Sequence, residues 1–147
     1  MPPPAPTVRA VADTNTVVSA FLWGGTPAEV LAAAREQRLS LFTSAALIAE
    51  LEDVLSREKF SARIARVGST PAEMITGYRA LAQLVRTAEI TPVSRDPDDD
   101  QVIACALAAD AGLIITRDRD LRTLDPFRTI RILPAREALT LLAEPRG

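Results

Sequence analysis

The sequence contains no histidine, and this absence removes several classes of active site at once. Catalysis by a Ser–His–Asp or Cys–His arrangement needs an imidazole as general base. Zinc sites with imidazole ligands are excluded for the same reason. Any metal site in this chain must therefore be built mainly from oxygen ligands.

Cysteine is almost as scarce, and Cys105 is its only example. A single cysteine forms neither an internal disulfide nor a thiolate zinc cluster. It lies in the apolar stretch VIACALAA (102–109), where we expect it to act as a small core residue. This cysteine usage fits a reducing compartment.

An excess of positive charge is also missing, because the formal net charge is −2 and the predicted pI is about 5.2. No global basic field therefore points to nucleic-acid binding. The cations are nevertheless biased in kind, with 16 arginines and only Lys59 as lysine. Arginine offers a planar fork to phosphate and can stack on bases, although its abundance can equally reflect genome composition.

Long apolar runs are absent, since no stretch approaches the roughly 20 residues needed to cross a bilayer. The N-terminal MPPPAPTVR also lacks the charged-then-apolar order of a signal peptide. We interpret residues 1–7 as a flexible lead and expect a cytoplasmic protein. The 147 residues, 48% of them apolar, suit a single domain over residues 8–147.

Apolar strand-like segments alternate with helical patterns along the whole chain. Strands are predicted at 8–12, 39–43, 88–93, 113–116 and 129–133. Helices are predicted at 16–22, 26–38, 45–57 (with Ser44 as N-cap), 58–67, 72–85, 101–111 and 134–143. This alternation predicts the α/β class, as a three-layer α/β/α sandwich around a central, mainly parallel sheet of about five strands.

Acidic residues follow the predicted strands, close to the point where each strand ends. Ligands of parallel sheets bind beyond the carboxyl ends of the strands. We therefore expect these acids to converge at one edge of the sheet. In chain order they are Asp13, Glu50, Asp96, Asp98, Asp99, Asp100, Asp118 and Asp120.

Such convergence has an electrostatic cost. Two carboxylates about 4 Å apart repel each other by roughly 4 kcal/mol at an effective dielectric constant near 20. A hard divalent cation removes this repulsion, and Mg²⁺ and Mn²⁺ prefer oxygen ligands. The pattern therefore predicts a Mg²⁺ or Mn²⁺ site that includes Asp13, the carboxylate that interrupts the apolar stretch AVADTNTVV (10–18).

Each acid also has an ordinary structural explanation. Residues 13–15 could form a turn or cap, and the acids at 98–100 would favour a helix dipole. Glu50 and Glu52 lie at opposite edges of their helix's apolar stripe, so spacing does not choose between them. The segment 116–121, TRDRDL, could be a surface turn whose arginines and aspartates pair with one another. The joint pattern carries more information than any single acid.

Three blocks, in this order, resemble the PIN domain family. They are VADTN (11–15), ALIAELEDVL (46–55) and DPDDDQVIACALAADAGLIITRDRDL (96–121). The resemblance extends from about Val8 to Leu142, and its last block is the most specific part. It is closest to small bacterial VapC-like ribonucleases that act as the toxins of toxin–antitoxin systems.

The resemblance implies a set of site residues by position. The four family acids, which act as catalytic residues and metal ligands, match Asp13, Glu50, Asp100 and Asp118. Competing or supporting positions are Asp98 and Asp99 beside Asp100, Asp120 beside Asp118, and the small polar residues Asn15 and Thr116, which would orient the acids.

The resemblance further implies a Mg²⁺- or Mn²⁺-dependent endoribonuclease that hydrolyses the phosphodiester bonds of single-stranded RNA. A cognate antitoxin protein would be its partner, and a homodimer is expected because related proteins are often dimers. Arg95, Arg117 and Arg119 adjoin the acids and could contact backbone phosphates. Ion pairing with the neighbouring aspartates is the alternative for these arginines.

Two other functions stay open at the level of sequence. One is a non-catalytic RNA-binding or scaffold protein that retains the PIN-like fold. The other is a receiver-like signalling domain, which also has acids at strand ends. A receiver normally carries a lysine near the end of its last strand, and RILPAR (131–136) has none.

Overall fold

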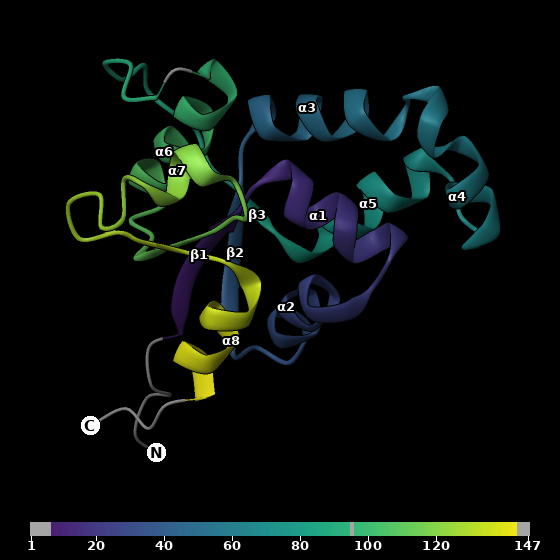
Figure 1. The fold of residues 1–147 in the computed structure, drawn as a ribbon, viewed down its shortest axis with the longest axis horizontal. Helices are drawn as coiled ribbons and strands as arrows, with labels where there is room; N and C mark the ends of the chain where they lie inside the picture. The colour runs from purple at the N-terminus through teal and green to yellow at the C-terminus, as the bar shows by residue number, and fades with distance from the viewer. Residues whose placement is uncertain (1–6, 95, 144–147) are drawn as a thin grey trace.

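The structure is a computed structural model that describes residues 7–94 and 96–143. Its centre is a five-stranded sheet in the order β3-β2-β1-β4-β5, and every neighbouring pair is parallel. The strands are β1 (Val8–Ala12), β2 (Leu39–Thr43), β3 (Gln83–Leu84), β4 (Leu113–Ile115) and β5 (Arg131–Leu133). This confirms the predicted α/β class with a parallel sheet (Figure 1).

Helices connect these strands and cover the sheet. They are α1 (Thr14–Leu22), α2 (Gly25–Arg35), α3 (Ala45–Leu55), η1 (Glu58–Phe60, a 3₁₀ turn), α4 (Ser61–Arg66), α5 (Pro71–Leu81), α6 (Pro97–Ala108), α7 (Arg119–Arg122) and α8 (Ala135–Ala143). Within the described part of the chain, no single helix has both the length and the apolar content to cross a membrane. The consecutive helices α1 and α2 reach that length and apolar content only when taken together, and they are bent by 98° relative to each other.

The strands are apolar on both sides, as strands between two layers of helices must be. In β1, Ala10 and Ala12 contribute to one hydrophobic cluster and Val11 to another. In β4, Ile115 and Ile114 divide in the same way. Side chains alternate between the two faces of a strand, so each face of the sheet has its own core.

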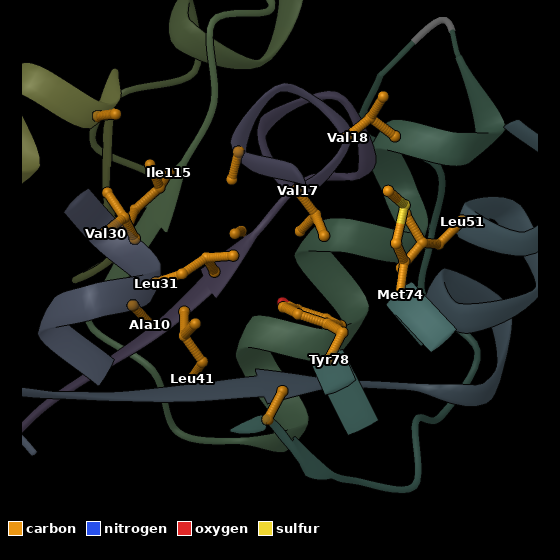
Figure 2. Packing of buried hydrophobic residues seen from close by; sticks show 14 of the residues in the cluster. Ala10, Val17, Val18, Val30, Leu31, Leu41, Leu51, Met74, Tyr78 and Ile115 are labelled. Carbon is orange, nitrogen blue, oxygen red and sulfur yellow. The ribbon is translucent and has the colours of Figure 1, made fainter. Parts of the chain in front are cut away.

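The larger core lies between the sheet and α1, α2, α3, α5 and α8. Figure 2 shows Val17 of α1, Leu31 of α2 and Tyr78 of α5 directed toward the apolar side chains of the strands. The smaller core, on the other face, joins α6 and α7 to the sheet through Ile103, Leu121 and the buried Cys105. Two helical layers around one sheet give the predicted three-layer sandwich.

One predicted strand is wrong. Residues 88–93 contain no regular secondary structure, and the edge strand is instead Gln83–Leu84, which pairs with Phe42 and Thr43 of β2. The predicted helix over 72–85 accordingly ends at Leu81, because Ala82 is already extended. An edge strand of two residues has too short a pattern to register in sequence, whereas the alternation in AEITPV imitates a strand without any partner to pair with.

Smaller differences concern boundaries. The predicted helix over 58–67 is divided into η1 and α4, and the last strand begins at Arg131 rather than at residue 129. The first helix starts at Thr14, two residues before its predicted start, because Asp13 caps it. The predicted flexible lead falls, except for Thr7, outside the described residues.

Candidate active site

Asp13 lies between β1 and α1 and is held by hydrogen bonds to both of its oxygens. The Thr16 amide donates to Oδ1 at 2.9 Å, and the Thr116 hydroxyl donates to Oδ2 at 2.5 Å. Asp13 therefore caps α1, as the structural alternative predicted. Its side chain is buried, and burial raises the pKa of its carboxyl, against the lowering effect of these hydrogen bonds. Among the described residues, no cation pairs with this carboxyl.

Thr116 links the ends of the two central strands β1 and β4. Its hydroxyl is fully buried, donates to Asp13 and accepts a hydrogen bond from the Asp118 amide at 2.9 Å. Asp118 in turn caps α7, since its Oδ1 accepts from the Asp120 amide at 2.7 Å. Two acids 105 positions apart in sequence thus share one threonine. Asn15, the other predicted orienting residue, is exposed and has no side-chain hydrogen bond within the described structure.

The acidic run at the start of α6 separates into distinct environments. Successive residues of a helix differ by about 100° in direction, so Asp98, Asp99 and Asp100 cannot share one partner. Asp98 is exposed, whereas Asp99 is 6% exposed and accepts a hydrogen bond from the Ser94 hydroxyl at 3.1 Å. Asp100 turns to the preceding loop, where its Oδ1 accepts from the Val93 and Ser94 amides, both at 2.9 Å.

Asp99, and not Asp100, joins the acids that follow β4. Carboxylate oxygens of Asp99, Asp118 and Asp120 all lie within 4.8 Å of one another. Asp99 is buried, Asp118 half-buried and Asp120 exposed, so the group opens to solvent on one side. From the sequence, Asp100 and Asp118 are the preferred ligands, and Asp99 and Asp120 are the alternatives. The structure groups Asp118 with Asp99 and Asp120, and Asp100 is not in this group.

Glu50 approaches the same region from α3, while Glu52 of the same helix is exposed. Burial raises the pKa of Glu50 first, and the negative charges of Asp98, Asp13 and Asp96 raise it further. Thr14 is close enough to lower that pKa, yet its buried hydroxyl has no hydrogen-bond partner of good geometry. A buried hydroxyl without a partner beside carboxylates is a polar atom available to a ligand.

Burial, and after it the negative charge on neighbouring acids, raises the pKa of Asp99 and of Asp13, and no cation among the described residues pairs with them. Burial and then Asp118 raise the pKa of Asp99 to about 6, and Asp118 also contributes to the raised pKa of Asp13. Within the described ranges, none of the site acids forms a salt bridge, and Arg117 and Arg119 pair with neither Asp118 nor Asp120. The surface-turn alternative for 116–121 is therefore contradicted. Arg95, predicted to contact RNA, lies outside the described residues.

This donor set fits a hard divalent cation. It offers carboxylate oxygens from the start of α6 and from the segment after β4, and Thr116 connects Asp13 at the end of β1 to that segment. Mg²⁺ and Mn²⁺ bind such oxygens and offset their repulsion. A softer metal would call for imidazole or thiolate ligands, and neither is present at this edge.

Comparison with known families identifies this arrangement. The sequence model of the PIN domain matches residues 9–120, which include all the acids described above. The chain belongs to the PIN domain family. The receiver-like alternative is thereby set aside. Among curated proteins, by contrast, no sequence matches this PIN domain.

Solved structures share the fold of this PIN domain at low sequence identity. PAE2754 from Pyrobaculum aerophilum is 12% identical with a TM-score of 0.55, over 94% of this chain and 98% of that one. VapBC2 from Rickettsia felis, bound to a DNA fragment from their promoter, is 13% identical with a TM-score of 0.58, over 85% and 97%. VapBC-1 from nontypeable Haemophilus influenzae is 13% identical with a TM-score of 0.55, over 88% and 99%.

Two polar residues of the site were missed from sequence, namely Ser94 and Thr14. Ser94 lies in the loop before the acidic run, where SRDP reads as an ordinary turn. Thr14 follows Asp13 directly, within a DTN segment that is also typical of an ordinary turn or cap. Serine and threonine occur in most turns, so no sequence signal distinguishes these two.

Proposed function

We propose that this PIN domain is a Mg²⁺- or Mn²⁺-dependent endoribonuclease that hydrolyses phosphodiester bonds of single-stranded RNA. The observation that carries this proposal is the convergence of carboxylates from separate elements, with Asp99 buried, Asp118 half-buried and Asp120 exposed, on a PIN fold, without a salt bridge to any of them among the described residues. Keeping such groups together costs stability unless a cation binds there. Family membership supplies the expectation of nuclease chemistry.

The ligands we propose are Asp99, Asp118 and Asp120. Asp13 is linked to Asp118 through the Thr116 hydroxyl and adds negative charge next to them. Asp99 takes the place expected for Asp100, because a carboxylate oxygen of Asp99 lies within 4.8 Å of those of Asp118 and Asp120, whereas Asp100 turns its Oδ1 to the amides of the preceding loop. When bound, the cation would supply Lewis-acid chemistry, polarising a phosphate oxygen and lowering the pKa of the attacking water.

The protein groups hold this site ready for the substrate. Thr116 and Thr16 fix both oxygens of Asp13, so its carboxylate does not need to reorient during the reaction. Glu50 stands beside the group with a raised pKa, which suits a carboxylate that orients a water and takes up its proton. Thr14 offers an unused hydroxyl to the same water or to a phosphate oxygen.

A biological role as a toxin follows as part of the proposal. Two of the structural relatives are VapBC proteins, and the sequence resembles the VapC-like subgroup. We propose that a cognate antitoxin protein restrains the nuclease in the cytoplasm and that the PIN domain forms a homodimer. Co-purification with the product of the neighbouring gene, followed by size determination, tests both statements.

The activity is tested by incubating the purified protein with structured and unstructured RNAs in Mn²⁺, Mg²⁺ or EDTA. Asp13→Asn should abolish cleavage, because it preserves the cap on α1 but removes the charge. Glu50→Gln should lower the rate by about 100-fold if Glu50 handles a proton. Glu52→Gln, on the same helix but exposed, is the matched control and should cleave like the wild type.

Cleavage that survives both EDTA and Asp13→Asn would rule out the proposed mechanism. RNA binding without cleavage, and indifferent to changes of the acids, would instead support a non-catalytic PIN-like protein.

A further inference from the structure

The segment that follows β4 sorts its opposite charges to opposite sides. Arginines and aspartates alternate from Arg117 to Asp120, and Arg122 follows one turn after Arg119. The two aspartates contribute oxygens to the acidic group with Asp99. The arginines are exposed and line two surface hollows. Alternating charges that could neutralise one another are thus kept apart by the fold.

The first hollow has a volume of about 400 Å³ and lies between the starts of α2 and α8. Thr26, Arg117 and Arg136 line it, together with Glu137. Arg117, which lines it, directly precedes Asp118 of the acidic group in sequence. Figure 1 shows α2 and α8, whose first residues line this hollow, as neighbouring helices.

The second hollow, of about 310 Å³, adjoins the first and shares Pro134 and Glu137 with it. It is lined by Arg119, Arg122 and the ion pair of Arg131 with Asp125. Five arginines and two carboxylates therefore line the two hollows, in a chain whose net charge is −2. Arg117, Arg119, Arg122 and Arg136 form no salt bridge with any residue that the structure describes.

We infer that these two hollows form the binding track for the sugar–phosphate backbone of single-stranded RNA on one side of the scissile phosphate. The inference rests on the proposed function, since it assigns a path to the substrate of that site. Unpaired arginines present forked donors to phosphate oxygens. An acidic protein with a carboxylate cluster at its active site repels RNA overall, so the backbone needs such a local cationic surface.

Arg117 and Arg136 line the first hollow from different elements, the end of β4 and the start of α8. Both sides of one phosphate could therefore be contacted there. Arg119 and Arg122 continue the cationic surface along α7 into the second hollow.

The test measures RNA binding separately from cleavage, by fluorescence anisotropy of a labelled, unstructured RNA in EDTA at several salt concentrations. Arg117→Gln/Arg136→Gln should weaken binding by on the order of tenfold at 0.1 M salt and reduce the salt slope by about 1.4, since each lost phosphate contact on a single strand removes about 0.7. Arg35→Gln/Arg79→Gln removes the same charge from exposed positions outside both hollows and should change binding far less.

Thermal melts would first establish that both double variants are folded. If the two then have the same RNA affinity and the same salt slope, the proposed track is wrong and the hollows bind another partner. If the wild type cleaves RNA in Mn²⁺ but the double variants bind alike, the track fails and the proposed function stands. If the wild type never cleaves but its RNA binding depends on Arg117 and Arg136, the nuclease proposal fails and the track stands.

Discussion

Two buried or half-buried aspartates of this chain, Asp125 and Asp99, occupy opposite electrostatic environments. Asp125 accepts from Arg131 Nε at 3.1 Å and from the Ile132 amide at 2.7 Å, and the bond from Arg131 lowers the pKa of its carboxyl. Asp99 accepts from the neutral Ser94 hydroxyl, and its burial raises the pKa to about 6. Over residues 7–94 and 96–143, Asp125 therefore pairs with a cation, whereas Asp99 has a hydroxyl partner and two neighbouring carboxylates but no salt bridge.

The difference separates an acid that stabilises the fold from the acids that we propose as metal ligands. The ionised form of Asp125 stabilises the folded state, whereas the ionised form of Asp99 opposes it. Groups whose pKa is strongly shifted by burial and like charge concentrate at functional sites. The acids after β1 and β4 and at the start of α6 thus have the electrostatics of a ligand site, and those of Asp125 are typical of a stabilising contact.

The largest expected effect is on cleavage. Asp99→Asn removes a proposed metal ligand and should lower the rate by at least about 100-fold. Glu52→Gln, an exposed acid outside the site and both hollows, should stay near the wild-type rate. Asp100→Asn, whose side chain turns to the loop, should also cleave RNA, which separates Asp99 from its neighbour. A rate that falls with Asp100 and not with Asp99 would reverse the assignment.

The next effect is on thermal stability in the presence of metal. A ligand at 100 times its Kd stabilises the folded state by about 2.7 kcal/mol, so Mn²⁺ should raise the Tm of the wild type. Asp118→Asn should remove most of this increase, while Asp125→Asn should retain it. A Tm that responds equally in both variants would place the cation elsewhere.

The pH dependence of stability without metal should also distinguish the two aspartates. Because the pKa of Asp99 is raised, its contribution is present below pH 4 and is lost as the pH rises toward about 6. Asp99→Asn should therefore be more stable than the wild type at pH 7, by about 1–2 kcal/mol in EDTA. The lowered pKa of Asp125 acts in the other direction, and its contribution is lost as the pH falls below 4.

The smallest effect concerns Asp125 itself. Asp125→Ala leaves the part-buried Ile132 amide without its acceptor and should lower the free energy of unfolding by about 1 kcal/mol. Asp125→Asn keeps an acceptor oxygen and should recover most of this loss. Denaturant unfolding of both variants gives the comparison. A stabilised Asp125→Ala variant would contradict the structural role.

Much of the fold could be predicted because its signals are local. Residues 8–12 and 39–43 are short, apolar and bounded by polar residues, and both are strands as predicted. Ser44 caps its helix as its sequence pattern indicated. Residues 88–93 failed because an alternating pattern specifies a strand only when a neighbour pairs with it, and β2 pairs with Gln83 and Leu84 instead.

The site was predictable in outline but not in its membership. The positions of Asp13 and Asp118 directly after apolar strands marked them from sequence, and Thr116 connects them in the structure. The choice among Asp98, Asp99 and Asp100 depends on the rotation of α6 about its axis. That rotation is set by which side chains of α6 pack on the sheet, so a run of identical residues contains no information about it.

The sequence by itself determined the chemistry available to this protein. Without histidine and with one cysteine, its concentrated acids could build only an oxygen-ligand site, and their positions after strands placed that site at the carboxyl edge of the sheet. The tertiary structure alone decided which acids lie close together and which of the described arginines form no salt bridge with them. Alternating charges in TRDRDL are equivalent along the chain, and they become different only when the packing of α7 turns the aspartates toward Asp99 and the arginines toward the neighbouring hollows.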